Sequence, residues 1–333
     1  MGNTVTIFDI AREAGVSPST VSRVLNGTVP VAPDKRDLVL AVVKKFRYHP
    51  NPIAQGLVRG RTAAIGVLTQ SIASPYYGEI LLAVEQGLAG SGYHLIFTSG
   101  NWQTEDELAA LDLLSARRVD GLIVLAGVIS DDDLRRAADE LPLVVIGRSI
   151  AGIEDQCLRI NDFHAAYEAT RYLISLGHRR IVHIAGPVHH QDAVDRRAGY
   201  LRALQEASLT LDEQLIMVGD FTEQSGLLAM QALLNRAMIF SAIFAANDQM
   251  AYGARLALYR HGIRVPDDVS LVGFDDQPAS AYTTPALTTV RQPTHDMGRA
   301  AAQAVLRLLN GQPPALPVIT TELVIRESAA RRR

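Results

Sequence analysis

Residues 6–27 have the sequence TIFDIAREAGVSPSTVSRVLNG. Apolar residues recur at helical spacing from Ile7 to Ala14, and Gly15 predicts the end of that helix. Ser17 followed by Pro18 is typical of a second helix that starts with a side-chain cap and a first-turn proline. Two short helices joined by a tight, glycine-containing turn form a helix-turn-helix.

A third helix is predicted to follow and to close a small core. Its expected buried stripe consists of Leu38, Val39, Val42, Val43 and Phe46. Three such helices can close a core of about 50 residues, although a core of that size is marginal. The alternative at this point is a small helical bundle that packs on the rest of the chain.

The charges of the chain are unevenly distributed. Residues 1–61 carry nine Arg and Lys against four Asp and Glu, a net charge of +5, which leaves −8 for the remainder of a chain of net charge −3. A small basic unit on a larger acidic one indicates a polyanion partner for the first unit only. The short polar side chains and Arg23 of the second helix favour the major groove of DNA, where arginine can donate two hydrogen bonds to guanine.

Length and composition indicate more than one globular unit. The chain has 333 residues, of which 48% are hydrophobic and 20% charged. No apolar run approaches the roughly 18 residues of a membrane helix, and the N-terminus has no pattern of a secretory signal. The single cysteine, Cys157, excludes a disulfide framework and a thiolate metal cluster. We therefore expect a cytoplasmic protein.

From residue 62 onward, strand-like and helical patterns alternate. This alternation predicts an α/β fold of parallel sheets covered by helices on both faces, and the length favours two sheets, divided near residue 162. The strand-like runs are residues 65–70, 94–98, 121–126, 143–147, 157–161, 181–185, 215–218, 242–246 and 269–274. The helical patterns include residues 76–90, 104–117, 164–176, 192–207, 222–236 and 249–262. A strand or connector at 287–293, a helix at 295–309 and a strand at 319–325 end the pattern.

Residues 6–27, together with FRYHPNPIAQGLVRGRT at 46–62, resemble the headpiece and hinge of the lactose-repressor/galactose-repressor (LacI/GalR) family. The resemblance runs through nearly the whole chain with the same spacing. Residues 147–157 and 192–200 look most like the galactose-repressor branch. The later segments that fit the family are LGHRRIVHIAGP, AANDQMAYGA, VSLVGFDD and PALTTVRQP.

The resemblance implies a division of the chain into domains. Residues 1–50 would form the helix-turn-helix DNA-binding headpiece and residues 51–61 the hinge helix or linker. The core would be two doubly wound parallel-sheet lobes, like those of periplasmic binding proteins. Its N-terminal lobe would comprise residues 62–162 and 292–325, its C-terminal lobe residues 163–291, and residues 326–333 would form a tail.

The resemblance also implies DNA contacts. Ser19 and Arg23 match base-reading positions, whereas Pro18 matches a base-facing position but has no hydrogen-bonding side chain. In the family the hinge becomes helical on the operator, and Leu57 takes the place of a leucine that wedges into the minor groove. The full set of matched positions, most of which touch the sugar-phosphate backbone, is Ile7, Ser17, Pro18, Ser19, Thr20, Ser22, Arg23, Asn26, Tyr48, Asn51, Ala54 and Leu57.

Polar and aromatic residues follow the predicted strands, where ligands bind to such sheets. Carboxylates and a guanidinium pair with hydroxyl groups, and aromatic faces stack on a sugar ring, so the set suits a sugar. Asn161-Asp162 reverses the order usual in the family, and Gly147 replaces an acid found in some members. The residues that match effector contacts are Tyr77, Arg148, Arg196, Phe221, Asn247 and Asp275. The alternative for Arg196 and Asp275 is a structural salt bridge.

Catalysis and metal binding have weak support in the sequence. Asp275-Asp276 could be an acid/base pair, but adjacent carboxylates at a strand end are more often ligand or cap groups. His189-His190 has no third metal ligand at a recognisable spacing. The chain lacks GxxxxGK[ST], HExxH and GxSxG. We therefore expect no enzyme activity, no cofactor and no metal.

These observations predict a sequence-specific DNA-binding transcriptional regulator, a repressor, whose operator affinity is set by a small sugar-like effector. Its expected partners are double-stranded operator DNA, the effector and a second copy of the chain. Dimer contacts are expected from helices 76–90 and 249–262, and no heptad repeat that would make a tetramer follows Ile325. The alternatives are a sugar-binding receptor or transport component without DNA function, and a sugar-modifying α/β enzyme.

Overall fold

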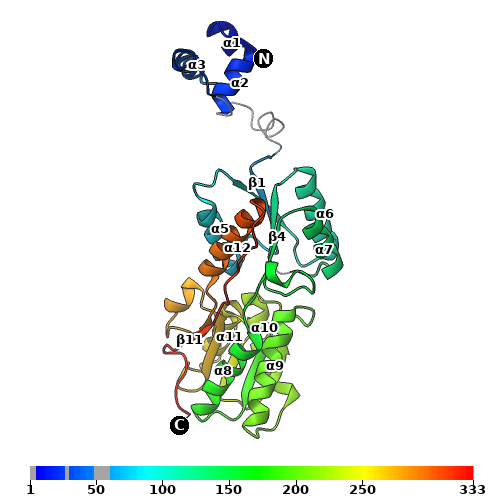
Figure 1. Cartoon of the computed structure of the whole chain (residues 1–333). Coiled ribbons are helices and arrows are strands. Elements are labelled where there is room, and N and C mark those ends of the chain that lie inside the picture. The colour runs from blue at the N-terminus through cyan, green and yellow to red at the C-terminus, as the bar shows by residue number, and fades with distance from the viewer. Residues whose placement is uncertain (1–4, 27–29, 49–60, 126, 333) are drawn as a thin grey trace. The chain divides into compact units, whose positions relative to one another are not determined.

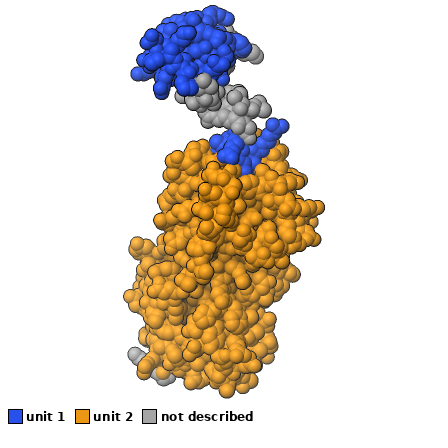
Figure 2. All heavy atoms as spheres, in the orientation of Figure 1, with its two compact units in different colours: residues 1–64, 118–120 blue, residues 65–117, 121–333 orange. Residues whose placement is uncertain are grey.

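The computed structural model describes residues 5–26, 30–48, 61–125 and 127–332. The chain divides into two compact units: residues 1–64 with 118–120, and residues 65–117 with 121–333 (Figure 2). Each unit has a hydrophobic core of its own.

The first unit contains the predicted helix-turn-helix. Gly15, between its first two helices, has φ +62°, a left-handed conformation that glycine adopts without steric cost. Thr6 and Asp9 cap the first helix reciprocally, each side chain binding the backbone of the other. The Ser17 hydroxyl accepts a hydrogen bond from the Thr20 amide at 3.2 Å, as expected of a helix N-cap. The helices (Figure 1) are α1 (Ile7–Glu13), α2 (Pro18–Asn26) and α3 (Pro33–Phe46).

A small apolar core holds these three helices together. The prediction for α3 is partly wrong, because Leu38 and Phe46 remain 49% and 36% exposed. The expected stripe was wider than the surface that α1 and α2 cover, so only its middle is buried. The buried core residues are Ile10, Ala11, Ala14, Val21, Val39 and Val42.

The second unit contains two sheets, each at the centre of one lobe (Figure 1). The first sheet is parallel where its register is defined and has the order β2-β1-β3-β4-β5, the doubly wound arrangement. Its strands, which match the predicted runs closely, are β1 (Ala64–Thr69), β2 (His94–Ser99), β3 (Gly121–Leu125), β4 (Leu143–Ile146) and β5 (Cys157–Leu158).

The helices of the first lobe come from two distant parts of the sequence. Three of them lie between its strands: α5 (Pro75–Leu88), α6 (Thr104–Ala116) and α7 (Asp131–Glu140). The fourth, α12 (Thr294–Leu309), packs along α5 and against β3 and β4 (Figure 1). Gly298 of α12 permits this close approach, since a Cβ there would lie 2.5 Å from the Ile80 carbonyl oxygen.

The second sheet has the order β11-β10-β9-β8-β6-β7. Its helices pack in pairs, α8 with α9 and α10 with α11. The strands are β6 (Ile181–Ala185), β7 (Ile216–Val218), β8 (Ala242–Ala245), β9 (Ser270–Asp275), β10 (Thr288–Arg291) and β11 (Glu322–Val324). The helices are α8 (Asp162–Ser175), α9 (Gln191–Glu206), α10 (Glu223–Asn235) and α11 (Asp248–Arg260), with 3₁₀ turns η1 (Glu154–Gln156), η2 (Glu213–Leu215) and η3 (Pro278–Ala281).

The last strand corrects the predicted division of the lobes. Residues 292–325 were expected in the first lobe, but β11 pairs with β10 of the second sheet, with Val290 opposite Leu323. The pairing is antiparallel, so the second sheet is not wholly parallel. The reason is that α12 returns the chain to the first lobe, and the segment after it crosses back to an open sheet edge.

The segment predicted as a tail, residues 326–333, is packed against the second sheet where it is described. Ser328 is 1% exposed, and its carbonyl accepts a hydrogen bond from the Leu271 amide at 2.8 Å. The Ser328 hydroxyl donates to the Leu271 carbonyl at 2.6 Å. Arg326 donates to Asp276 and to the Leu287 carbonyl. These bonds make the segment an integral edge of the second lobe.

Candidate functional site

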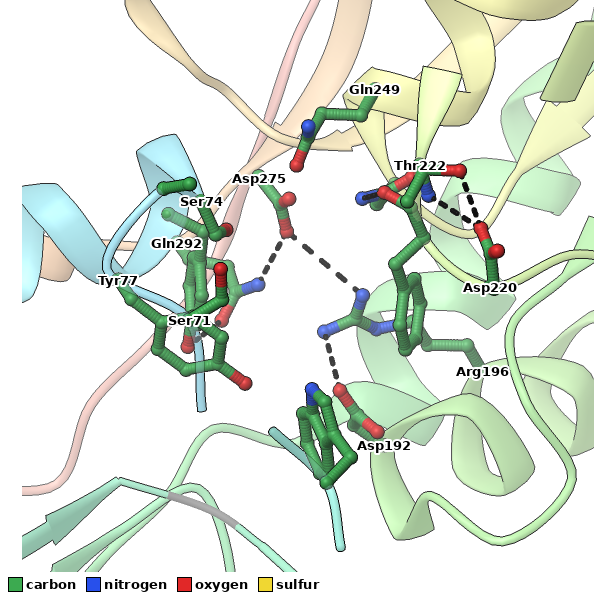
Figure 3. Close-up of a pocket in the computed structure, with 15 residues that line it drawn as sticks. Ser71, Ser74, Tyr77, Asp192, Arg196, Asp220, Thr222, Gln249, Asp275 and Gln292 are labelled. Carbon is green, nitrogen blue, oxygen red and sulfur yellow. Dashed lines mark hydrogen bonds and ion pairs between the residues drawn. The ribbon is translucent and has the colours of Figure 1, made fainter. Parts of the chain in front are cut away.

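A cavity of about 300 Å³ lies at the carboxyl ends of strands from both sheets (Figure 3). This is where open α/β sheets bind ligands, and the volume suits a small molecule. Both lobes contribute side chains. The lining residues are Ser71, Ala73, Ser74, Tyr76, Tyr77, Trp102, Asp192, Arg196, Asp220, Phe221, Thr222, Asn247, Gln249, Asp275 and Gln292.

Arg196, in the second turn of α9, is the centre of the charged wall of the cavity. It is 4% exposed, and its Nε donates to Asp162 Oδ1 at 2.7 Å. Its Nη1 donates to the Ala246 carbonyl at 2.7 Å. The guanidinium carbon also lies 3.8 Å from the centroid of the Phe274 ring, a favourable cation–π distance. These contacts fix the position of the guanidinium.

Two further carboxylates lie near Arg196 but do not touch it. Its Nη2 is 3.8 Å from Asp192 Oδ2, and its Nη1 is 3.9 Å from Asp275 Oδ1 (Figure 3). Both distances exceed a hydrogen bond. A hydroxyl group to one side of such a pair could accept from the guanidinium and donate to the carboxylate.

Burial shifts the pKa of the carboxyl groups that surround Arg196. It raises the pKa of Asp162 to about 6, although the neighbouring Arg196 opposes the shift. It raises the pKa of Asp275 well above the usual range, again against the effect of Arg196. For Arg196, the surrounding carboxylates outweigh the effect of burial and raise its pKa, so the guanidinium stays charged.

Asp275 is held by a chain of hydrogen bonds that crosses to the first lobe. Gln292, after β10, donates from Nε2 to Asp275 Oδ1 at 2.7 Å. The Tyr76 hydroxyl of α5 donates to Gln292 Oε1 at 3.2 Å. The backbone of Asp275 has φ +115°, outside the regions that residues with a side chain normally adopt. Such strain is often found at functional sites.

Aromatic side chains form a second wall of the cavity. Tyr77 lies 6.4 Å from Trp102, measured between ring centroids. Trp102, from the first lobe, stacks on His190 of the second lobe at 3.6 Å with the planes 20° apart. His190 in turn lies 5.7 Å from Phe221. Trp102 therefore joins the lobes beside the cavity, and its amide donates to Gln70 Oε1 at 3.0 Å.

The structure brings together five of the six predicted effector contacts: Tyr77, Arg196, Phe221, Asn247 and Asp275 all line the cavity. Asn247 also has a structural role. Its Oδ1 accepts from the Met250 amide and caps α11, and its Nδ2 donates to the Phe221 carbonyl at 2.9 Å. The alternative role given for Arg196, a structural salt bridge, also has partial support, because Arg196 forms an ion pair with Asp162.

Arg148 is the exception. It does not line the cavity. Its guanidinium donates to the carbonyls of Gly127 and Ile129, at 3.2 and 2.6 Å, in the segment after β3. Glu107 accepts hydrogen bonds from two amides of the same segment. The residue therefore contacts a loop of the first lobe through Nη1 and Nη2, while its buried Nε has no hydrogen-bond partner among the described residues. Its role as an effector contact stays a prediction.

Trp102, Asp192 and Asp162 contribute to the site, although none of them is among the six predicted effector contacts. The signal for Asp162 was the reversed Asn161-Asp162 pair. Asn161 caps α8, which leaves Asp162 to face Arg196. Gln249 and Gln292 have no such signal, since each follows a strand by a few residues without a distinctive pattern.

The headpiece presents the predicted base-reading residues to solvent. Pro18, Ser19 and Arg23 of α2 are exposed. The Ser19 hydroxyl lies 2.8 Å from the Ser17 hydroxyl, within hydrogen-bond distance. The other described candidates also have contacts within the headpiece. Ser17 caps α2, with Thr20 bonded to it, and Ser22 is half-buried; Ile7 and Tyr48 pack against the small core. The side chain of Asn26, and Asn51, Ala54 and Leu57 as a whole, lie outside the described residues.

A helix-turn-helix unit and a two-lobed core with a polar cavity define a DNA-binding regulator that responds to a ligand. A family model described as bacterial regulatory proteins, lacI family, matches residues 6–51, and one described as periplasmic binding protein-like domain matches residues 170–329. The chain belongs to the LacI family of bacterial regulatory proteins, because relatives from that family match nearly its whole length.

Two curated relatives show the extent of this match. The HTH-type transcriptional repressor PurR of Proteus mirabilis (strain HI4320) is 38% identical over 331 residues, which are 98% of this chain and 97% of that protein. The HTH-type transcriptional regulator GalR of Escherichia coli (strain K12) is 38% identical over 316 residues, 95% of this chain and 92% of that protein. The relatives are transcriptional regulators, so this chain is a regulator and not an enzyme.

Solved structures agree with this family. The structure of the lac repressor dimer bound to operator and the anti-inducer ONPF has a TM-score of 0.88 and 29% identity, and covers 98% of this chain and 100% of that chain. A complex of the transcriptional regulator CelR with cellobiose has a TM-score of 0.72 and 35% identity, with the same coverage of both chains. The predicted family, fold and regulatory role are confirmed.

Within the described part of the chain, no helix is long and apolar enough to cross a membrane. The described residues also include no group of three or more His, Cys, Asp or Glu side chains arranged to hold a metal ion.

Proposed function

We propose that this regulator binds a near-palindromic operator as a dimer and that a sugar-like effector in the cavity sets its affinity for that DNA. The observation that carries the effector proposal is the pair of gaps, 3.8 and 3.9 Å, between Arg196 and the carboxylates of Asp192 and Asp275. In each pair, an N–H donor of Arg196 and a carboxylate oxygen are held near each other without forming a hydrogen bond. One sugar hydroxyl can accept from the donor and donate to the oxygen at the same time.

The aromatic wall supports the same class of ligand. Tyr77, Trp102 and Phe221 offer apolar faces beside the charged wall. A pyranose ring has C–H groups on its faces and hydroxyls on its rim, so one ligand can use both walls. CelR, a relative of the same architecture, forms a complex with cellobiose, which is a disaccharide.

The DNA side of the proposal rests on α2. Arg23 and Ser19 are exposed on this helix, whose first turn is fixed by the Ser17 cap. A recognition helix of this kind reads base edges with its N-terminal residues, and a symmetric dimer reads paired half-sites. Because operator DNA is the partner, we assign the protein to the cytoplasm.

The proposed dimer uses apolar side chains that the isolated chain leaves uncovered. Leu82 of α5 is 47% exposed, and Leu256 and Tyr259 of α11 are 41% and 80% exposed. They lie in the two segments from which dimer contacts were predicted. Exposed apolar groups on both lobes fit a partner that touches both. A change in the orientation of the two lobes relative to each other would then change the relative positions of the two headpieces in the dimer.

The test is a gel-shift titration with the DNA upstream of the protein's own coding sequence, with and without a panel of mono- and disaccharides. We expect one retarded species of dimer stoichiometry and a sugar that changes its affinity. Absence of binding to this DNA and to operators selected from random sequence would refute the proposal.

Arg23→Ala tests the recognition helix. Loss of a bidentate contact to guanine should cost about 1–3 kcal/mol on the operator and relax preference at one base pair per half-site. Arg36→Ala is the matched control, since it removes the same charge from an exposed position of α3. Equal losses on operator and random DNA in Arg23→Ala would show a phosphate contact only.

A further inference from the structure

An anionic ligand needs a cation, or unpaired N–H groups, within reach. All three lysines of the sequence, Lys35, Lys44 and Lys45, lie in the headpiece, so the core has arginine as its only permanently charged cation. Among the described residues that line the cavity, Arg196 is the one cationic side chain. Among these residues, Arg196 is therefore the only cation with which an anion in this part of the cavity could pair.

Two of the five N–H groups of Arg196 are already bonded within the protein. Nε and Nη1 donate to Asp162 and to the Ala246 carbonyl, each at 2.7 Å. The remaining N–H groups point toward Asp192 and Asp275 (Figure 3). A phosphate on Arg196 would have to lie beside these two carboxylates at close range. The repulsion is strong because Arg196 and Asp275 are buried, where the effective dielectric is lower than in bulk water.

The carboxylates of the cavity outnumber its cation. Asp192, Asp220 and Asp275 all line it, and Asp162 lies directly behind Arg196. Besides burial, Asp192 and Asp248 help to raise the pKa of Asp275. The site thus contains more acidic groups than Arg196 compensates.

The N-termini of helices can offset this excess of acidic groups, because each N-terminus carries roughly half a positive charge. Three of those at the cavity already have a side-chain oxygen on a first-turn amide: Asp192 on α9, Thr222 on α10 and Asn247 on α11. The first turn of α5 has no side-chain cap, but it begins with Pro75, which has no N–H. The half-charge at the N-terminus of α5 alone does not balance the carboxylates of the cavity.

Basic groups near the cavity do not supply the positive charge that its carboxylates lack. Arg148 does not line the cavity, and its Nη1 and Nη2 donate to the carbonyls of Gly127 and Ile129. Burial lowers the pKa of His190, which favours its neutral form.

We infer that the cavity selects a polyhydroxylated effector that is uncharged or carries an amino group, and that it rejects phosphorylated and carboxylated sugars. This inference rests on the proposed function, because it specifies the ligand of the same cavity. Asp192 is its main determinant, since it adds a carboxylate to the rim 3.8 Å from the one guanidinium.

The charge of the cavity can be measured without a known effector, because Trp102 is the only tryptophan of the chain and lines the cavity. The experiment is quenching of its fluorescence in the full-length protein by iodide, caesium and neutral acrylamide at constant ionic strength. N-acetyltryptophanamide supplies the reference for each quencher. We expect the iodide-to-caesium ratio of quenching constants to be at least about twofold lower than in the reference, because a potential of a few kT excludes the anion.

Matched variants separate the cavity from the net charge of the protein. Asp192→Asn should bring the ratio toward the reference. Asp139→Asn makes the same change of net charge at a position of α7 that does not line the cavity, and should leave the ratio unchanged. Equal quenching by iodide and caesium, relative to the reference, would overturn the inference. An equal response of the two variants would overturn it as well.

A ligand series distinguishes this inference from the proposed function. Glucose, glucosamine, glucuronate and glucose 6-phosphate are compared by thermal shift and by their effect on operator binding. Tighter binding of the phosphate or the uronate than of glucose would refute the charge selectivity and leave the sugar-controlled regulator standing. Exclusion of iodide with no response of operator binding to any sugar of a wide panel would support the selectivity and refute the proposed effector class.

Discussion

At the scale of single residues, the cavity depends on one guanidinium whose position several partners fix. Arg196 is bound to Asp162 and stacked on Phe274 before any ligand arrives. Preorganised donors lose little freedom on binding, so the hydroxyl of a ligand gains most of the hydrogen-bond energy. We therefore expect Asp162 to contribute to ligand affinity through Arg196, although it does not line the cavity.

Asp275→Asn should weaken sugar binding by about 1.5–3 kcal/mol, the worth of one hydrogen bond to a charged group. Operator binding without sugar should stay unchanged, since the headpiece is a separate unit. Calorimetric titration of the sugar found in the panel, with a gel shift, measures both. Asp276→Asn is the control, because this neighbour binds Arg291 and Arg326 outside the cavity. Normal sugar affinity in Asp275→Asn would contradict the assignment.

His183 predicts a dependence of stability on pH. It is fully buried in β6, where its Nδ1 lies 3.0 Å from the Phe244 carbonyl, and burial lowers its pKa from 6.5 to about 4. The unfolded chain takes up a proton near pH 6.5 that the native state excludes. The contribution of His183 is therefore fully present above about pH 6.5 and is lost as the pH falls toward 4.

Urea unfolding of the wild type and of His183→Phe at pH 7.5 and 4.5 checks this expectation. The acid-induced loss of unfolding free energy should be about 2 kcal/mol smaller in the variant, because phenylalanine takes up no proton when the chain unfolds in acid. His164→Phe, at an exposed position, is the control. Equal losses in the wild type and His183→Phe would mean that His183 does not titrate on unfolding.

At the scale of elements, glycines permit the close approach of α10 and α11. A Cβ on Gly253 of α11 would lie 1.8 Å from the Glu223 carbonyl oxygen of α10, and one on Gly226 of α10 would lie 2.1 Å from the Met250 carbonyl oxygen. The two glycines thus allow the backbones of α10 and α11 to touch at a distance that leaves no room for a side chain. This contact holds α10 and α11 together on one face of the second sheet.

Gly253→Ala should lower the unfolding free energy by about 3 kcal/mol, at the upper end of overpacking costs, because backbone atoms cannot move aside easily. Gly78→Ala is the matched substitution in α5, where a Cβ meets nothing within 4 Å. It should raise stability by up to about 1 kcal/mol, the difference in helix propensity. Denaturant unfolding measures both, and the same sign for both variants would refute the argument.

At the scale of the whole molecule, the chain consists of two units with separate cores. The cavity lies entirely in the second unit. A ligand that binds there stabilises the unit that holds it by mass action. The headpiece has a core of only a few side chains, so its own stability is small.

Scanning calorimetry of the full chain should therefore show two transitions, with the headpiece unfolding first. A sugar that binds the cavity should raise the temperature of the second transition by several degrees at saturating concentration and leave the first within error. Asp275→Asn should reduce the shift. Equal movement of both transitions would show that the units unfold together, contrary to this expectation.

Features that depend on neighbouring residues could be predicted from the sequence. Helical spacing, the Ser17 cap and Gly15 defined the helix-turn-helix, because these signals act within a few residues of one another. The alternation of strands and helices predicted two lobes and brought polar residues to the strand ends. Tyr77, Arg196 and Asp275 were identified there through a family resemblance carried by intact local motifs.

Features that depend on distant partners became clear only from the folded chain. The pairing of β11 with β10 follows from the path of α12, which no pattern in a three-residue strand encodes. Arg148 binds the carbonyls of Gly127 and Ile129, and Asp162 binds Arg196, 34 residues away. The physical reason is that a charged side chain satisfies its hydrogen bonds with whichever groups packing brings near it, and local sequence does not specify those groups.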